Sequence, residues 1–225
     1  MNHRFLVVGV IALALGLRGD GGAGAIALPL PRYDGPMSLE KALQSRRSIR
    51  NYSKAPLTLA EVGQVLWAAQ GITDPATGYR TAPSAGAFHP LEVRLAARRV
   101  EGLPPGLYRY VPAGHRLELV RAGDAIPAIG GAAHGQPPFA GAAAVLIISA
   151  DPARTTVKYG GRTTRYLDLE AGHAAQNAAL QATALGLGTV TIGAFDDDAL
   201  TRAAQLPAKQ LPLYLMPMGR PARLP

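Results

Sequence analysis

The longest helical pattern in this sequence of 225 residues runs from Asp168 to Leu187. Apolar or small residues recur along it at helical spacing, at Leu169, Gly172, Ala175, Ala179, Leu180, Thr183 and Ala184. Gly186 and Gly188 close the pattern, as glycines commonly do after a helix. Small side chains allow neighbouring elements to approach closely, so we expect this helix to lie in the middle of the core.

Short strand patterns accompany the helical one and predict a β-sheet. The continuous apolar run Ala142–Ala150 is typical of a buried central strand. Other strands are expected at Leu91–Ala97, Gly106–Val111, Arg116–Val120, Val190–Ile192 and Leu211–Met218. Pro212 and Pro217 place the last of these at an edge, because proline cannot donate a ladder hydrogen bond. The predicted fold class is therefore α+β.

Shorter helices are indicated by their caps. Ser38 is a candidate N-cap for Leu39–Ser45, and Thr58 with Glu61 forms a capping box for a helix that ends at Gly71. Further helices are expected at Asp124–Gly131 and Asp196–Ala204, and a loop at Asp74–Pro90. No segment repeats, and the length suits one domain, which we place at residues 38–225.

The first 25 residues have the pattern of a secretory signal peptide. A basic start, Met1–Arg4, precedes an apolar run from Phe5 to Leu17, and Ala23-Gly24-Ala25 matches a cleavage site. The run has about 13 residues, fewer than the roughly 20 that a membrane-spanning helix needs. We therefore expect a periplasmic or secreted protein without stable membrane insertion of its mature chain, beginning with a leader at residues 26–37. An uncleaved anchor and a misassigned start codon are the alternatives.

Composition excludes several kinds of chemistry. The sequence has no cysteine, which excludes disulfides, thiolate catalysis and cysteine-ligated zinc or iron–sulfur clusters. The formal net charge of +8 serves either solubility or the attraction of anionic ligands such as phosphates. The basic residues are scattered and no aromatic-rich strand accompanies them, so we do not expect nucleic-acid binding.

Two segments carry residue types suited to a flat, phosphorylated ligand. Arg46-Arg47-Ser48-Ile49-Arg50 offers three guanidiniums and a hydroxyl, which can hold a phosphate through forked, charge-assisted hydrogen bonds. Ala82–Pro90 is rich in small residues that let the backbone approach a ring, and Ser84 can offer its hydroxyl and N–H to ring heteroatoms. Each has a plainer interpretation: a solvated basic turn for the first, an ordinary surface loop for the second.

Three further segments give weaker signals. Gly172-His173 and Gln176-Asn177 lie inside the long predicted helix, where a lone histidine is more often structural than a ligand. No second histidine or carboxylate follows at three or four residues, so we predict no metal site. Ile192-Gly193-Ala194-Phe195 ends a strand before an acidic helix start, and Gly219-Arg220 follows the last strand.

In their order along the chain, these segments resemble the nitroreductase superfamily, and within it the SagB/ThcOx-like dehydrogenase branch. The resemblance runs from about Ser38 to Arg220. Beyond the arginine segment and Ala82–Pro90, it rests on Lys158-Tyr159-Gly160, Arg165-Tyr166, Glu170–Asn177, Ala184–Gly188 and Ile192–Asp196. The azoline-oxidising members of that branch are cytoplasmic parts of peptide-modifying assemblies and several are longer, so this short chain with an export signal departs from them.

The resemblance implies a mixed sheet flanked by helices in an interlocked homodimer, with two FMN sites at the subunit interface. The phosphate, the ribityl chain and one ring edge would be bound by Arg46, Arg47, Ser48 and Arg50. The flavin would be lined, from the other subunit, by Pro83, Ser84, Ala85 and Gly86. The isoalloxazine and its N5 would be approached by the backbone of Gly193 and Ala194, and a second phosphate contact would come from Arg220.

Lys158-Tyr159 matches a Lys-Tyr pair that is a proton-transfer candidate in the azoline-oxidising members. Lys158 could take a proton while hydride leaves to the flavin; alternatively the lysine is a structural or phosphate-side charge and the tyrosine is packing. The predicted function is an FMN-dependent oxidoreductase that passes hydride between a reductant, NAD(P)H or another donor, and a small organic acceptor. The rivals are a flavin-binding or redox-sensing protein without turnover, and a structural exoprotein without cofactor.

Overall fold

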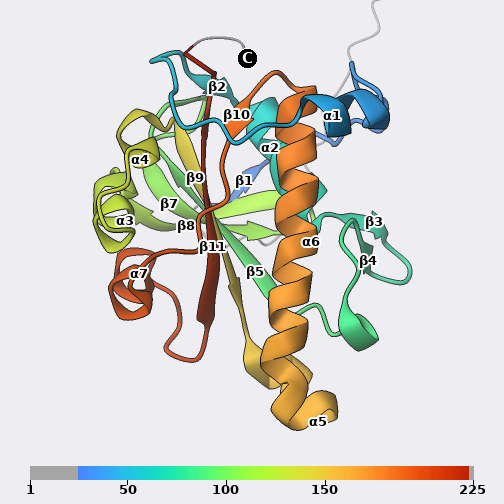
Figure 1. The fold of residues 1–225 in the computed structure, drawn as a ribbon. Helices are drawn as coiled ribbons and strands as arrows, with labels where there is room; N and C mark the ends of the chain where they lie inside the picture. Colours follow the sequence, from blue (N-terminus) through green and yellow to red (C-terminus); the bar gives the residue numbers. More distant parts are fainter. Residues whose placement is uncertain (1–24, 223–225) are drawn as a thin grey trace, which may run out of the picture.

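The computed structural model of the chain describes residues 25–222, and Figure 1 shows its fold. All but the last residue of the predicted signal peptide lie outside this range, so that prediction and the localisation that follows from it remain predictions. Ala25 begins β1 (Ala25–Ala27), which pairs antiparallel with β8 (Arg116–Ala122). The start of the predicted leader is therefore part of the sheet.

A sheet of seven strands forms the centre of the fold. Its order from one edge to the other is β1, β8, β7 (Gly106–Val111), β5 (Leu91–Ala97), β9 (Ala144–Ala150), β11 (Leu211–Gly219) and β10 (Gly188–Thr189). These neighbours all pair antiparallel. Beyond β10, a parallel bridge joins Ser48 to Thr189. The expected α+β fold with a central sheet is confirmed, and the strands of that sheet are antiparallel instead of mixed.

Helices cover both faces of this sheet (Figure 1). One face carries α1 (Leu39–Ser45), α2 (Leu59–Gln70) and the long α6 (Thr163–Ala184); the other carries α3 (Ile126–Ala132), α4 (Pro138–Gly141) and α7 (Asp197–Ala203). The helix α5 (Pro152–Tyr159) leads into α6, and a 3-10 turn, η1, spans Ala85–Ala87. Two small ribbons pair β2 (Leu57–Thr58) with β6 (Val100–Glu101) and β3 (Ile72–Asp74) with β4 (Tyr79–Arg80).

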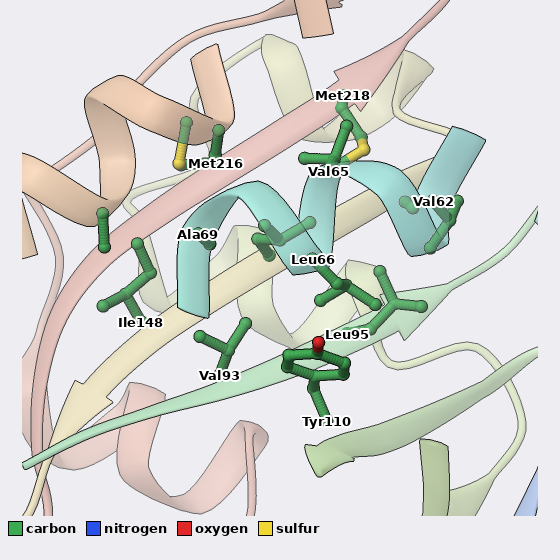
Figure 2. Packing of buried hydrophobic residues seen from close by; sticks show 14 of the residues in the cluster. Val62, Val65, Leu66, Ala69, Val93, Leu95, Tyr110, Ile148, Met216 and Met218 are labelled. Atoms are coloured by element: carbon green, nitrogen blue, oxygen red, sulfur yellow. The ribbon is translucent and has the colours of Figure 1, made fainter. Parts of the chain in front are cut away.

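The first part of the core lies between the sheet and the helices α2 and α6, and Figure 2 shows its α2 side. From α2, Val62, Val65, Leu66 and Ala69 face the sheet and are at most 1% exposed. Opposite them stand Val93, Leu95, Tyr110, Ile148, Met216 and Met218. Burial of one Val or Leu side chain stabilises the fold by about 1.5–3 kcal/mol, so this contact holds α2 firmly. The capping box that the sequence predicts at Thr58 and Glu61 is present and fixes where α2 begins.

The second part of the core lies on the opposite face, under α3 and α7. There Ile126, Ile129 and Leu200 pack with Val145 and Ile147 of β9. Because alternate residues of β9 serve the two cores, all seven of its residues are buried. This explains the uninterrupted apolar run, and β9 is the buried central strand that the sequence predicts.

Two predicted elements differ in position from those of the structure, and one helix is not predicted. The helix α6 begins at Thr163 instead of Asp168, because it continues directly from the turn that follows α5. The outermost strand is Gly188–Thr189 instead of Val190–Ile192; of the predicted range only Ile192 pairs, through a bridge to Leu215. No helix is predicted from the sequence at α5, although Asp151 and Pro152 are the N-cap and first-turn proline of a helix start. Within residues 25–222, no helix is long and apolar enough to cross a membrane.

The predicted edge position of the last strand is also wrong, since β10 lies outside β11. This neighbour pairs only with Met218 and Gly219. Pro212 and Pro217 lie before that stretch, where a missing N–H costs no ladder bond on the β10 side.

Candidate functional site

The arginine segment, residues 46–50, is held by backbone hydrogen bonds to two distant parts of the chain. Ile49 N donates to Thr189 O at 2.9 Å, and Ser53 N donates to Arg220 O at 2.8 Å. The arginine segment therefore lies beside the end of β10, and the chain just after the segment pairs with Arg220. We call this region, residues 46–50 with 189–194 and 220, the arginine end.

Close approach at the arginine end depends on two glycines. A Cβ atom on Gly188 would lie 2.6 Å from Ile49 Cγ2, and one on Gly219 would lie 2.9 Å from Tyr52 Cβ. Both distances are shorter than a real Cβ contact, so any larger residue would push the arginine segment off the sheet.

The side chain of Tyr52 holds the arginine segment against β11 through hydrogen bonds to the backbone. Its Oη lies 2.6 Å from Ile49 O and 2.9 Å from Pro217 O. Burial raises the pKa of Tyr52, and the positive charge of Arg50 lowers it by less. The hydroxyl therefore stays neutral and serves as a hydrogen-bond donor to the backbone.

The arginine segment, residues 46–50, carries three positive charges. Arg47 and Arg50 are exposed and Arg46 is half-buried. Among residues 25–222, none of these three guanidiniums forms an ion pair. Arg47 Nη1 donates instead to Gln44 O at 3.0 Å and Arg46 O at 2.8 Å. With the exposed hydroxyl of Ser48 beside them, these groups suit a multiply charged anion such as a phosphate.

Arg220 differs from the other arginines because it already has an anionic partner. Its Nη2 lies 3.0 Å from both carboxylate oxygens of Glu61, and its Nε donates to Pro56 O at 3.1 Å. This guanidinium ties the end of β11 to the capping box of α2. Within residues 25–222 its Nη1 has no hydrogen-bond partner, so this group could contact a phosphate while the Glu61 pair stays in place.

Gly193 and Ala194 lie in the exposed loop that joins β10 to α7. Two hydrogen bonds between Ile192 and Leu215 anchor the loop to β11, and Gln136 Nε2 donates to Ala194 O at 2.9 Å. The N–H groups of Gly193 and Ala194 have no hydrogen-bond partner in the part of the chain that is described. They are therefore free to donate to an acceptor such as a ring nitrogen.

The other predicted flavin contacts, Pro83–Gly86, lie in a strained loop. Gly86, Ala87 and His89 adopt left-handed φ angles of 64°, 56° and 46°. Such a conformation costs a residue other than glycine about 1–2 kcal/mol. Strain of this kind persists only where surrounding contacts enforce it. We call residues 83–89, together with Lys158, Tyr159 and Glu170, the loop end.

The contact that enforces this loop comes from α6. Glu170 is 4% exposed, and its Oε1 accepts a 2.8 Å hydrogen bond from Ala85 N. The Ser84 hydroxyl also hydrogen-bonds to Glu170 and accepts from His89 N at 2.9 Å. Burial raises the pKa of Glu170, and these hydrogen bonds oppose that rise. The sequence predicts the Ser84 hydroxyl as a ring contact, but here it is engaged inside its own subunit.

Aromatic rings join α5 to the same loop. Tyr159 packs edge-on against Phe88, with ring centroids 6.2 Å apart, and lies 4.4 Å from the Tyr166 ring. Lys158 Nζ lies 5.5 Å from the centroid of Tyr159, within the range of a cation–π contact. Lys158 and Tyr159, predicted as a proton-transfer pair, are thus adjacent to the predicted flavin-lining loop.

The arginine end and the loop end are far apart in one subunit. Arg47 and Thr183 border one cavity of about 150 Å³, whereas Ala85 bonds to Glu170. Thr183 and Glu170 are separated by about 20 Å along α6 at 1.5 Å per residue. In Figure 1, α6 stands between η1 and the loop that joins β10 to α7. The predicted site residues therefore form two groups, which do not meet within a single chain.

Glu170 and Asn177 are site residues that the sequence does not identify as such. Asn177 Nδ2 donates to Thr81 O at 3.1 Å, so two residues of α6 hold the start of the loop. The stripe proposed from the sequence includes Leu169, which is 49% exposed, while Glu170 faces inward with Leu167 and Ala174. A carboxylate in register with that buried stripe was the available signal. Among the described residues, no three His, Asp or Glu side chains gather to form a possible metal site.

Comparison with known proteins identifies the family. Residues 43–220, most of the chain, match the nitroreductase family. The chain belongs to the nitroreductase family. A protein of Methanocaldococcus jannaschii that is named as a nitroreductase is 45% identical over 184 residues, which cover 82% of this chain and 91% of the relative.

Solved nitroreductase structures share the fold. A nitroreductase from Ralstonia eutropha superposes with a TM-score of 0.78 at 32% identity, over 88% of this chain and 90% of the other. The NADPH:FMN oxidoreductase of Vibrio harveyi, solved with NAD+, has a TM-score of 0.59 at 19% identity, over 83% and 70% of the two chains. The predicted nitroreductase fold is confirmed, and the chain is an oxidoreductase of this family.

Proposed function

We propose that this nitroreductase is an FMN-dependent oxidoreductase that passes hydride between a reductant and a small organic acceptor. The observation that carries the proposal is the set of guanidiniums at residues 46–50 without ion pairs, together with the N–H groups of Gly193 and Ala194 without partners in the loop after β10, all within residues 25–222. A phosphate and a ring acceptor would satisfy both at once. When bound, FMN would supply the hydride chemistry at N5, and the chain would supply position and electrostatics.

Each residue of the arginine end has a role in this proposal. Arg46 and Arg50 bind the phosphate, with Arg47 and Ser48 beside them on the ribityl chain and ring edge. The N–H groups of Gly193 and Ala194 donate to the ring near N5. We assign Arg220 a lesser part in phosphate binding than the sequence alone implies, because its guanidinium is paired with Glu61.

The proposal includes a homodimer with two cofactor sites. The two groups of site residues do not meet within one chain, so a complete site needs the loop end of a second subunit. Pro83, Ser84, Ala85 and Gly86 of each subunit would then line the flavin held by the arginine end of the other. This arrangement also brings Lys158 and Tyr159 of the second subunit toward the substrate, where Lys158 Nζ can accept or return a proton.

Other parts of the proposal depend on the sequence. The resemblance to the SagB/ThcOx-like branch supports a dehydrogenase-type reaction, with Lys158 and Tyr159 as its proton-transfer groups. The name of the Vibrio harveyi relative supports FMN and, with its NAD+ complex, a nicotinamide donor such as NAD(P)H. A signal peptide at residues 1–25 and a periplasmic or secreted location stay part of the proposal.

Reconstitution tests the cofactor. The purified protein, mixed with excess FMN and desalted, should be yellow and hold about one FMN per chain. Its flavin, reduced with dithionite, should reoxidise faster with quinones or nitroaromatics than free reduced FMN does. Colourless protein would overturn the proposal, and bound flavin without accelerated reoxidation would reduce it to flavin binding without turnover.

Mixed dimers test the division of the site between two chains. Arg50→Ala damages the arginine end, and Gly86→Val damages the loop end, because Gly86 has a φ of 64° and a Cβ there would lie 2.9 Å from Phe88 Cε2. Each homodimer should bind FMN weakly at both sites. A dimer of one Arg50→Ala and one Gly86→Val chain has one site with both defects and one with neither, so it should bind one FMN tightly. If each site lay within one chain, the mixed dimer would bind none tightly.

A further inference from the structure

The side chain of Glu170 is a buried carboxylate that has no role in the proposed reaction. Glu170 is 4% exposed, and no Lys or Arg side chain forms an ion pair with it within residues 25–222. An ionisable group is rarely buried in this way unless it makes compensating hydrogen bonds. Its hydrogen bonds go to Ala85 N and the Ser84 hydroxyl, both of which belong to the loop proposed to line the flavin.

The loop needs such an anchor because its backbone is strained. Ala87 and His89 both adopt left-handed φ angles, and neither is a glycine. Ala87 N donates to Ser84 O at 3.1 Å and His89 N donates to Ser84 Oγ at 2.9 Å, so the strained turn folds around Ser84. Because Glu170 holds Ser84 and Ala85 directly, it determines where this turn stands relative to α6.

Glu170 is itself held in a fixed position within α6. Glu170 lies in a 22-residue helix between Leu167 and Ala174, both 0% exposed. Gly86 packs against α5, since a Cβ there would lie 3.2 Å from Tyr159 Oη. The position of Glu170 is therefore fixed by the core, and the loop is held from the α6 side and the α5 side.

We infer that Glu170 is a positioning residue, which holds residues 83–89 in the strained conformation that the proposed FMN site of the neighbouring subunit requires. Glu170 does not touch the flavin in this arrangement, and it acts through Ser84 and Ala85. Losing it should release the loop without unfolding the sheet. The inference rests on the proposed function for its consequence in FMN binding, but its structural part can be tested without cofactor.

The experiment compares three variants of the full chain, Glu170→Ala, Glu170→Gln and Asp168→Ala. Glutamine keeps the shape and can still accept from Ala85 N, whereas alanine can accept nothing. Asp168 is an exposed carboxylate two residues away on the same helix and is the matched control. In FMN-free protein, amide exchange of residues 84–89 should rise about tenfold or more in Glu170→Ala, since removal of the acceptor leaves the Ala85 N–H without its partner, a loss large enough for that factor. Exchange in β9 and α6 should stay slow.

FMN titration of the same proteins is the second measurement. The Kd should rise about tenfold or more in Glu170→Ala, while Glu170→Gln and Asp168→Ala should stay near the wild-type value. If Glu170→Ala does not fold, Glu170→Asp replaces it, because the shortened side chain withdraws from Ala85. Unchanged loop exchange in the folded variant would overturn the inference, as would a Glu170→Gln protein as loose as the alanine variant. If wild type binds no FMN but loop exchange responds as expected, the proposed function fails and the anchoring role stands.

Discussion

The two ends of α6 are built in opposite ways. At the arginine end the backbone is hydrogen-bonded to β10 and to Arg220, while the guanidiniums of residues 46–50 form no ion pair within residues 25–222. At the loop end the backbone is strained at Ala87 and His89, while the charged side chain, Glu170, is buried and hydrogen-bonded. The arginine end therefore presents exposed guanidiniums on a fixed backbone. The loop end presents a fixed backbone shape that the carboxylate of Glu170 maintains.

Because of this difference, we expect the arginine end to determine the affinity for a ligand and the loop end to determine the geometry of the site. Exposed guanidiniums supply attraction to an anion, and they tolerate small displacements because their side chains are long. A strained loop supplies a defined surface, and it tolerates little displacement because its shape depends on few contacts. We therefore expect charge substitutions to act mainly at the arginine end and shape substitutions to act mainly at the loop end.

The largest effect is expected at the loop end, on turnover. Lys158→Met removes the proposed proton-transfer group, and general acid–base catalysis contributes about 10²–10⁴-fold to a rate. We expect kcat for dehydrogenation of the true substrate to fall within that range while FMN stays bound, since Lys158 is exposed and belongs to α5. Rapid-reaction measurement of flavin reduction gives the rate, and the visible spectrum gives the occupancy. Loss of flavin would show that Lys158 is a cofactor-side charge.

At the arginine end, Arg50→Ala should weaken FMN binding without changing turnover at saturating FMN. A charge-assisted hydrogen bond contributes about 1.5–3 kcal/mol, which corresponds to an increase in Kd of about 10–150-fold. Arg46→Ala should behave in the same way. Fluorescence titration measures the Kd, and Arg121→Ala, on β8 at the far side of the sheet, is the matched control. An unchanged Kd in both site variants would remove the phosphate assignment.

The backbone packing of the arginine end can be disrupted without substituting a charged residue. Gly188→Ala would place a Cβ 2.6 Å from Ile49 Cγ2, and overpacking of this kind costs about 1–3 kcal/mol. Gly131→Ala in α3, where a Cβ would meet nothing within 4 Å, should be neutral or slightly stabilising. Urea unfolding compares the two proteins. Equal stability would mean that Ile49 can move aside, and that the arginine segment is less firmly seated than its contacts indicate.

Much of the fold could be predicted from the sequence because local signals and tertiary structure agree there. The capping box at Thr58 and the apolar run of β9 each report a local physical requirement that the fold also imposes. The strand β10 is not predictable because it depends on a neighbour: it is two residues long and exists through its pairing with β11. The helix α5 does carry a local signal, since Asp151 caps it and Pro152 opens its first turn. The arginine segment was found from residue types alone, since guanidinium clusters carry their chemistry in their composition.

The partners of the predicted site residues could not be predicted, because they come from distant parts of the chain. Glu61 was read only as a capping residue, and the structure adds its pair with Arg220, 159 positions away. Glu170 was read as part of a motif, and its contact with Ala85 spans 85 positions. Nothing in residue spacing determines which carboxylate will meet which backbone amide, so the role of the loop anchor emerges only from the folded chain.

The smallest effect expected is a pH dependence of stability at the loop end. Burial raises the pKa of Glu170 above its value in the unfolded chain, so the folded state favours the protonated carboxyl. The resulting stability is fully present below the unfolded pKa and is lost as pH rises through the folded pKa. Glu170→Gln cannot ionise and so does not lose this stability. The Tm of Glu170→Gln minus that of wild type should therefore increase as pH rises through this window and then level off. The increase should be about 2–4 °C for each kcal/mol of stability that wild type loses.

Asp168→Asn, at an exposed carboxylate on the same helix, should show no such trend. The positive charge of His173 favours the ionised form of Glu170, and the scan is best run in several buffers. A Tm difference that shrinks as pH rises would mean that the hydrogen bonds from Ser84 and Ala85 outweigh burial. The arginine end provides the contrast, because guanidiniums keep their charge throughout this range and Arg50→Ala should shift Tm equally at every pH.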